Sequence, residues 1–178
     1  MHAKISFLVI LLCGLAACEQ AQITQPPILV TAKDQAAAVG IDIYARDRSG
    51  GNPVPRFRGQ ETVQIRAFGN LNGDGLSEIT GATCMLDSGL YSANFSTPAN
   101  IGVPDYGPDS PSLFVRCEAS GLSGSVTVDA FNLTAAQRSN SAIGTGLLGA
   151  IIIGAVAAAN NDPSQDEYSY PAISLQLR

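Results

Sequence analysis

Short runs in which apolar and polar residues alternate recur along most of this 178-residue sequence. In residues 61–68, Val63, Ile65 and Ala67 fall on one face and Thr62, Gln64 and Arg66 on the other. A period of two is typical of a strand with one buried face. Similar runs, or runs rich in β-branched residues, occupy residues 28–31, 39–44, 90–95, 112–117, 125–133 and 172–177.

Residues typical of tight turns separate these runs. Gly, Pro, Asn, Asp and Ser cluster at residues 49–53, 72–75, 87–89 and 104–111, and such clusters mark chain reversals. Strands do not alternate with long helices, and no repeat is present. About seven short strands at this spacing predict a mainly β fold, an antiparallel β-sandwich that is loosely immunoglobulin-like.

One apolar segment, residues 142–159, interrupts the strand pattern. Residues 139–161 carry no charge, and small residues recur at every fourth position of the segment: Ala142, Gly146, Ala150, Gly154 and Ala158. On a helix they form a smooth face that a second backbone can approach closely. We expect a helical segment packed against its own β-domain, because the strand predicted at 172–177 must return to the sandwich. Membrane insertion and self-association through the small-residue face are the alternatives.

The first 17 residues have the composition of an export signal. Lys4 precedes an apolar run over residues 5–15, which is too short for a membrane span of about 20 residues. The run ends in Leu15-Ala16-Ala17-Cys18, which resembles the lipobox of bacterial lipoproteins. This resemblance implies cleavage before Cys18 and attachment of lipid to its thiol. An ordinary signal peptide, which would leave Cys18 as a disulfide partner, is the alternative.

The lipoprotein resemblance also implies a location. In lipoproteins of Gram-negative bacteria, Asp after the lipidated Cys favours the inner membrane, whereas this chain has Glu19. The resemblance therefore implies the outer membrane, with the chain facing the periplasm and the membrane as its partner through Cys18. Residues 18–27 end in two prolines and are expected to form a tether, and residues 28–178 a single β-domain.

Composition narrows the chemistry of the exported part. His2, the only histidine, and Lys4 lie in the signal, which leaves nine Lys and Arg against fifteen Asp and Glu. An acidic chain without a basic cluster is a poor nucleic-acid binder. Without histidine it has no Ser-His-Asp or Cys-His site and no His-ligated metal. Carboxylate pairs remain as acids and bases of the glycosidase type, but none has a distinctive setting. We therefore expect a non-enzymatic protein without a cofactor.

Two cysteines remain if Cys13 leaves with the signal and Cys18 takes lipid. Cys84 and Cys117 are then an even pair, and an oxidising compartment favours a disulfide between them. Two buried free thiols are the alternative.

Residues 70–81 begin like a calcium-binding loop. Asn70, Asn72 and Asp74 offer oxygen atoms at the first, third and fifth positions, and Gly75 is at the sixth. An EF-hand needs a bidentate Glu at the twelfth position, where this chain has Gly81. We therefore expect a polar hairpin turn between two strands.

Several motifs between Gly81 and Leu177 resemble a family of uncharacterised proteobacterial lipoproteins. They are Gly81-Ala-Thr-Cys84, Ser96-Thr97-Pro98-Ala99, Leu113-Phe-Val115-Arg-Cys117 and Tyr170-Pro171-Ala-Ile173, with the apolar segment before the last. The resemblance implies a small β-domain with a Cys84–Cys117 link and no known activity. The chain is also similar to small β-domains of the PEGA type, in which a Thr-Pro turn joins two strands, but here we expect a long loop over residues 101–111.

The function expected from these features is that of a binding or structural module on the envelope membrane, with an envelope protein as a further partner. The alternative is a membrane-active or self-associating protein that acts through the apolar segment.

Overall fold

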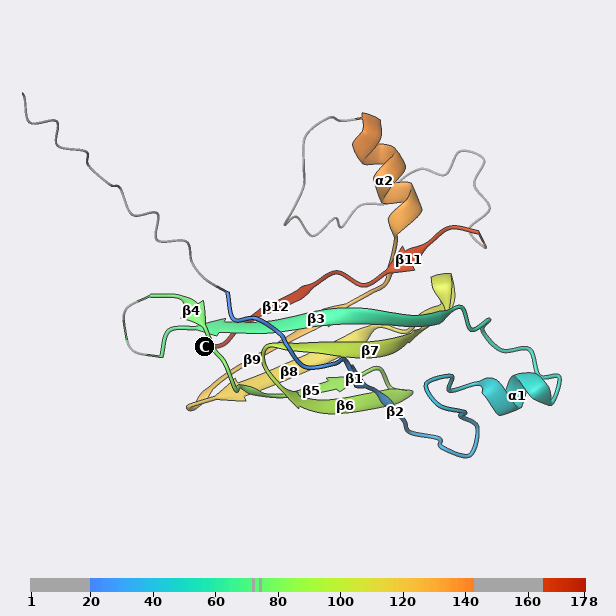
Figure 1. The fold of residues 1–178 in the computed structure, drawn as a ribbon, viewed down its shortest axis with the longest axis horizontal. Helices are drawn as coiled ribbons and strands as arrows, with labels where there is room; N and C mark the ends of the chain where they lie inside the picture. The colour runs from blue at the N-terminus through green and yellow to red at the C-terminus, as the bar shows by residue number, and fades with distance from the viewer. Residues whose placement is uncertain (1–19, 72, 74, 143–164) are drawn as a thin grey trace, which may run out of the picture.

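The two sheets of a β-sandwich pack face to face in this computed structural model, which describes residues 20–71, 73, 75–142 and 165–178 (Figure 1). Most strands in these ranges have between two and seven residues, and β3 is the longest. The architecture confirms the predicted mainly β sandwich.

The first sheet has the spatial order β1 (Ile28–Leu29), β7 (Ala99–Asp105), β3 (Gly59–Gly69) and β12 (Ile173–Gln176). A short strand, β4 (Ser77–Glu78), pairs with the end of β3. The β3–β7 and β3–β4 pairs are antiparallel, as expected. The outer strands β1 and β12 instead pair in parallel with β7 and β3, so the sandwich is mixed at the edges of this sheet.

The second sheet is antiparallel throughout. Its order is β2 (Thr31–Ala32), β6 (Tyr91–Ser96), β5 (Thr83–Asp87), β8 (Leu113–Ala119) and β9 (Leu122–Val128). Residues on β5, β6 and β8 alternate between buried and exposed, as a strand with one core face requires.

The two sheets are joined to each other at both edges of the sandwich. At one edge the chain passes from β1 in the first sheet to β2 in the second, and the buried side chain of Val30 lies between them. At the other edge the backbones of Ser123 and Arg178 exchange two hydrogen bonds of 3.0 Å each. The two sheets therefore enclose one core, whose largest fully buried side chains are Tyr91, Tyr106, Ile65, Leu86, Ile101 and Leu113.

Four shorter elements flank the sandwich. α1 (Ala45–Ser49) and the 3₁₀ helix η1 (Gly107–Asp109) lie at the end opposite β4 (Figure 1). β10 (Phe131–Asn132) and β11 (Tyr168–Ser169) form an antiparallel pair, here called the stem, and α2 (Leu133–Ala142) follows β10 directly. α2 stands away from the two sheets in Figure 1.

The prediction of a strand at residues 39–44 is wrong. The segment is a turn, with a single bridge between Val39 and Asp42. The Asp42 carboxylate accepts a hydrogen bond from the Tyr44 amide, and Gly40 has a positive φ of 59°. Local side-chain bonds of this kind compete with strand pairing, and β-branched composition did not reveal them.

The long loop predicted at residues 101–111 is also wrong, because β7 extends to Asp105 before η1 begins. Gly102 and Pro104 hide this strand, since both residues are rare in strand interiors. Side chains pack closely over Gly102: a Cβ there would lie 2.6 Å from Leu29 Cδ2 and 2.8 Å from Gln60 Nε2, so both side chains would have to move.

Candidate functional site

The segment that follows Cys18 is held against the sandwich at Ala21. The Ala21 amide donates a hydrogen bond of 2.8 Å to Glu78 Oε2, and its carbonyl accepts one of 3.0 Å from Arg66 Nη1. Arg66 and Glu78 also form an ion pair of 2.5 Å with each other. We call these three residues the clamp. The described part of the predicted tether, residues 20–27, is therefore fixed at its beginning.

The clamp follows from the register of the β3–β4 hairpin. Phe68 pairs with Glu78, and Arg66 is on the same face of β3 two residues earlier. Diagonal neighbours of this kind in an antiparallel pair are within reach of long side chains. Arg66 is on the polar face, as predicted, but it is only 8% exposed because the N-terminal segment covers it.

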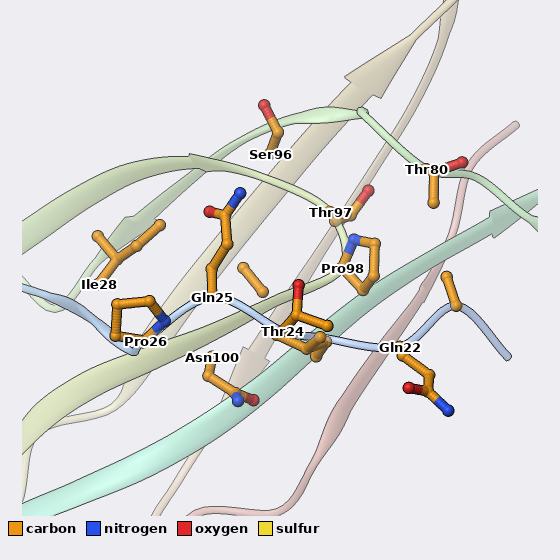
Figure 2. Close-up of a pocket in the computed structure, with 13 residues that line it drawn as sticks. Gln22, Thr24, Gln25, Pro26, Ile28, Thr80, Ser96, Thr97, Pro98 and Asn100 are labelled. Atoms are coloured by element: carbon orange, nitrogen blue, oxygen red, sulfur yellow. The ribbon is translucent and has the colours of Figure 1, made fainter.

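A groove of about 470 Å³ lies beside the clamp, between residues 21–28 and the turn at Thr97-Pro98. Figure 2 shows Thr24 and Gln25 on one wall facing Thr97 and Pro98 on the other. The Thr97–Pro98 peptide bond is cis. The Thr97 hydroxyl donates a hydrogen bond of 2.7 Å to the carbonyl of Ile79, just after β4.

The chemistry of the groove suits binding rather than proton transfer. Its polar lining consists of hydroxyl and amide side chains: Gln22, Thr24, Gln25, Thr80, Ser96, Thr97 and Asn100. The described residues that line it include no charged side chain. Such a lining can exchange hydrogen bonds with a neutral ligand, such as a peptide backbone or a sugar, but offers no group that titrates between pH 3 and pH 10.

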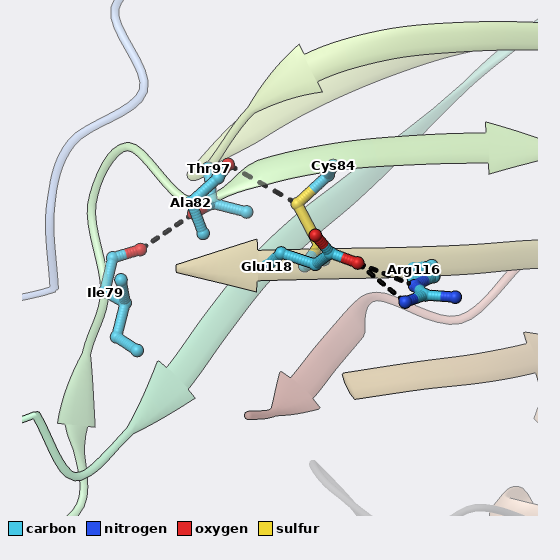
Figure 3. Close-up of a disulfide and its surroundings, with 7 residues drawn as sticks. Ile79, Ala82, Cys84, Thr97, Arg116 and Glu118 are labelled. Carbon is cyan, nitrogen blue, oxygen red and sulfur yellow. Dashed lines mark hydrogen bonds and ion pairs between the residues drawn. A yellow bond between two sulfur atoms is a disulfide. The ribbon is translucent and has the colours of Figure 1, made fainter. Parts of the chain in front are cut away.

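Cys84 and Cys117 form the predicted disulfide (Figure 3). They are directly opposite each other on the neighbouring strands β5 and β8, and both are almost fully buried. The bond therefore links two strands of one sheet rather than the two sheets of the sandwich. This differs from the inter-sheet bond of immunoglobulin domains.

The remaining predicted site residues lie outside the part that the structure describes. These are Cys18, in the predicted signal and anchor region, and Gly146, Ala150, Gly154 and Ala158 in the apolar segment. Only Ala142 of the small-residue face is described, and it is the last residue of α2. None of the described helices combines the length and the apolar character of a membrane span.

The stem joins the strand that precedes α2 to the strand that follows the apolar segment. The Leu133 amide donates to the Glu167 carbonyl at 2.8 Å. The nearly buried Asp166 carboxylate accepts from Asn132 Nδ2 at 2.8 Å and pairs with Arg138 at 3.2 Å. Its carbonyl accepts from Arg58. The start of α2 at Leu133 and the returning chain at Glu167 are therefore side by side.

Two further carboxylates are occupied in structural contacts. The Asp42 carboxylate binds Arg48 and the Tyr106 hydroxyl. Burial acts to raise the pKa of Asp42, but hydrogen bonds from Arg48, the Tyr44 amide and Tyr106 outweigh it, so the pKa is lowered. Glu61 accepts hydrogen bonds from Ser169 Oγ at 2.5 Å and the Tyr170 amide at 2.7 Å. Burial is the main cause of its raised pKa, and nearby Asp105 adds to it.

The calcium-loop resemblance at residues 70–81 is explained by a hairpin. Asn70 Oδ1 accepts a hydrogen bond from the Gly73 amide at 2.7 Å, which closes the turn between β3 and β4. Glu78 is turned to Arg66 in the clamp. Within the described ranges no group of His, Cys, Asp and Glu is arranged to hold a metal ion.

Sequence reasoning missed both the clamp and the groove. The signal for the clamp was present, since Arg66 on a polar strand face and Glu78 beyond a turn are a natural hairpin pair. The contact of Ala21 had no signal, because it joins segments 57 residues apart. Comparisons of the chain with family models, with curated proteins and with solved structures gave no match.

Proposed function

We propose that this chain is a non-enzymatic lipoprotein of the bacterial envelope, anchored through lipid on Cys18, whose β-sandwich is a binding or structural module. The outer membrane, with the domain facing the periplasm, is the proposed location, because Glu19 follows the cysteine. The Cys84–Cys117 disulfide supports an oxidising compartment.

The observation that carries this proposal is the clamp at Ala21. Ala21 is three residues beyond Cys18, and three extended residues span at most about 11 Å. A domain that is fixed this close to its anchor stands on the membrane surface. It does not extend to a distant partner on a long linker.

The groove is the proposed binding surface of the module. It is formed in part by the segment that follows the anchor, so a ligand there would lie near the membrane. Its uncharged hydroxyl and amide lining fits a neutral peptide segment or glycan. The carboxylates Asp42, Glu61 and Asp166, which are buried or half-buried, each have structural partners, which supports a binding role over acid–base catalysis.

One observation favours the second candidate, a membrane-active or self-associating protein. The stem presents the apolar segment as an insertion whose two ends are connected to one side of the sandwich. A single membrane crossing is incompatible with β12 pairing to β3, so bilayer contact through this segment would require entry and return on the same side.

Metabolic labelling with a fatty-acid analogue tests the anchor. The wild-type chain is expected to take the label and the Cys18→Ala variant to lose it, leaving precursor or released protein. Equal labelling of both chains would contradict the proposal.

Photo-crosslinking in intact cells tests the groove. A photoreactive residue at Asn100, which lines the groove, is expected to give a discrete product that mass spectrometry identifies. The same residue at Met85, 38% exposed on the second sheet, is the matched control. Equal products at both positions would argue against the groove as the binding surface.

A further inference from the structure

Two large apolar side chains are exposed in the turn between β3 and β4. Leu71 is 43% and Leu76 is 61% exposed, although most leucines of the described chain are buried or half-buried. We call them the hairpin leucines. Apolar surface in contact with water is unfavourable, and contact with another surface would remove that cost.

The hairpin leucines lie at the end of the sandwich where the chain arrives from Cys18. Leu76 immediately precedes β4, and Glu78 of β4 binds the Ala21 amide. Figure 1 shows the start of the blue segment, at residue 20, on the same side of the sandwich as β4, opposite α1. Since Cys18 is within about 11 Å of Ala21 along the chain, a lipid on Cys18 brings the membrane to the same end.

We propose that Leu71 and Leu76 contact the headgroup region of the membrane that holds Cys18, so that the sandwich stands on its β3–β4 end. This inference rests on the proposed lipid anchor and adds an orientation to it. The surface that the leucines contact is the lipid bilayer, because the short chain between the clamp and Cys18 would hold the bilayer next to them.

The charges near the hairpin leucines agree with shallow contact. The Glu78 carboxylate is already neutralised by Arg66, which lowers the cost of bringing this end close to a medium of low dielectric constant.

The orientation also separates the stem from the bilayer. Glu61, which binds Ser169 of the stem and the adjacent Tyr170, is five residues before Arg66 on β3. A strand rises about 3.3 Å per residue, so these two positions are about 17 Å apart. In this orientation the stem is therefore farther from the membrane than the clamp.

Tryptophan fluorescence of the full lipidated chain tests this orientation, because the chain contains no native tryptophan. Leu71→Trp, Leu76→Trp and a control, Val39→Trp, are reconstituted in vesicles of phosphatidylethanolamine and phosphatidylglycerol. Val39 is 59% exposed and lies between β2 and α1, at the other end of the sandwich (Figure 1). We expect a blue shift and quenching by acyl-brominated lipid for the two hairpin variants and neither effect for the control.

The outcomes distinguish the orientation from the anchor. If the protein carries lipid and floats with the vesicles, but the hairpin variants are no more quenched than Val39→Trp, the orientation is overturned and the anchor stands. If mass spectrometry finds no lipid and the protein does not float, the anchor fails and the orientation fails with it. A blue shift of the same size in unanchored Cys18→Ala protein without vesicles would assign the leucines to a second copy and overturn the lipid contact.

Discussion

The guanidinium of Arg66 lies 2.5 Å from the carboxylate of Glu78, and only 10% and 12% of the two side chains are exposed. Both groups also bind the backbone of Ala21. A buried ion pair contributes little net stability over a well-packed apolar pair, but the loss of one partner leaves the other charge buried and unpaired. The clamp therefore makes the position of the N-terminal segment depend on two side chains of one hairpin.

The Arg66→Ala variant is expected to be less stable than the wild type by about 3 kcal/mol, because it leaves Glu78 buried without its cation. Urea unfolding measures the loss. Limited proteolysis should also cut the segment before β1 faster, since Ala21 loses one of its two bonds.

The matched control for the clamp is Arg116→Ala. Arg116 pairs with Glu118 on the exposed face of β8, where 56% and 59% of the two side chains are accessible (Figure 3). Surface pairs contribute about 0–1 kcal/mol, so this variant should unfold close to the wild type and show unchanged proteolysis. Equal losses in the two variants would mean that the clamp contributes no more than a surface pair.

The sequence predicted the strands in which apolar and polar residues alternate regularly. The runs at 61–68, 90–95, 112–117 and 172–177 correspond to β3, β6, β8 and β12. The disulfide was also predicted, because Cys84 and Cys117 are the two cysteines left over if the chain is exported as proposed, and an even pair favours a bond. These features depend on local pattern and composition, which a single sequence displays.

The features that were missed depend on contacts between distant segments. β7 was not recognised because it contains Gly102 and Pro104, and only the structure shows that Leu29 and Gln60 pack against Gly102. The turn at 39–44 is set by Asp42, whose partners Arg48 and Tyr106 include one 64 residues away. The clamp and the groove require residues 21–28 to lie beside the Thr97-Pro98 turn, which no periodicity indicates.

Gly124 is expected to be required where the two sheets meet at the β9–β12 edge. A Cβ on this residue would lie 2.5 Å from the Gln176 carbonyl oxygen and 3.0 Å from Leu177 Cδ2, next to the Ser123–Arg178 bonds. Since the obstacle is backbone, β12 or β9 must move, and we expect Gly124→Ala to lower the free energy of unfolding by about 1–3 kcal/mol.

Gly50→Ala is the control for Gly124→Ala. Gly50 has a φ of −80° and follows α1, and an added Cβ would meet backbone oxygens no closer than 3.4 Å. Thermal unfolding of this variant should match the wild type or exceed it slightly. A Gly124→Ala chain as stable as Gly50→Ala would show that the edge can open without cost.

Glu61→Gln is expected to change how stability depends on pH. The raised pKa of Glu61, caused mainly by burial, means that the folded chain holds this proton more tightly than the unfolded chain. Its stabilising effect is complete below the unfolded pKa of about 4.3 and is lost as the pH rises through the folded pKa. The glutamine carbonyl oxygen can still accept from Ser169 and Tyr170, so the variant should gain stability relative to the wild type between pH 4 and pH 7.

Asp87→Asn provides the comparison of opposite sign. The hydrogen bond from Lys33 is the largest cause of the lowered pKa of Asp87, so this carboxylate stabilises the fold above its unfolded pKa and loses that effect as the pH falls. Urea unfolding across the pH range measures both effects. Relative to the wild type, the free energy of unfolding of Asp87→Asn should fall as the pH rises, whereas that of Glu61→Gln should increase. A pH-independent difference for Glu61→Gln would contradict the role of burial at this residue.

The last prediction concerns the apolar segment, residues 142–159, where the two proposed functions differ. We expect it to pack against its own domain and not to span a bilayer. The stem fixes both connections of the segment to one side of the sandwich, and Ile173 and Leu175 of β12 are buried in the core, so the chain must return after the segment. Packing within the chain would also remove aliphatic surface from water at about 25 cal/mol per Å². A Cys18→Ala chain without its signal should then be monomeric without detergent, as sedimentation measures, and should not float with vesicles. Flotation of this protein, or oligomers that Gly154→Leu disrupts, would favour the membrane-active or self-associating function, since a leucine on the small-residue face blocks close approach of a second backbone.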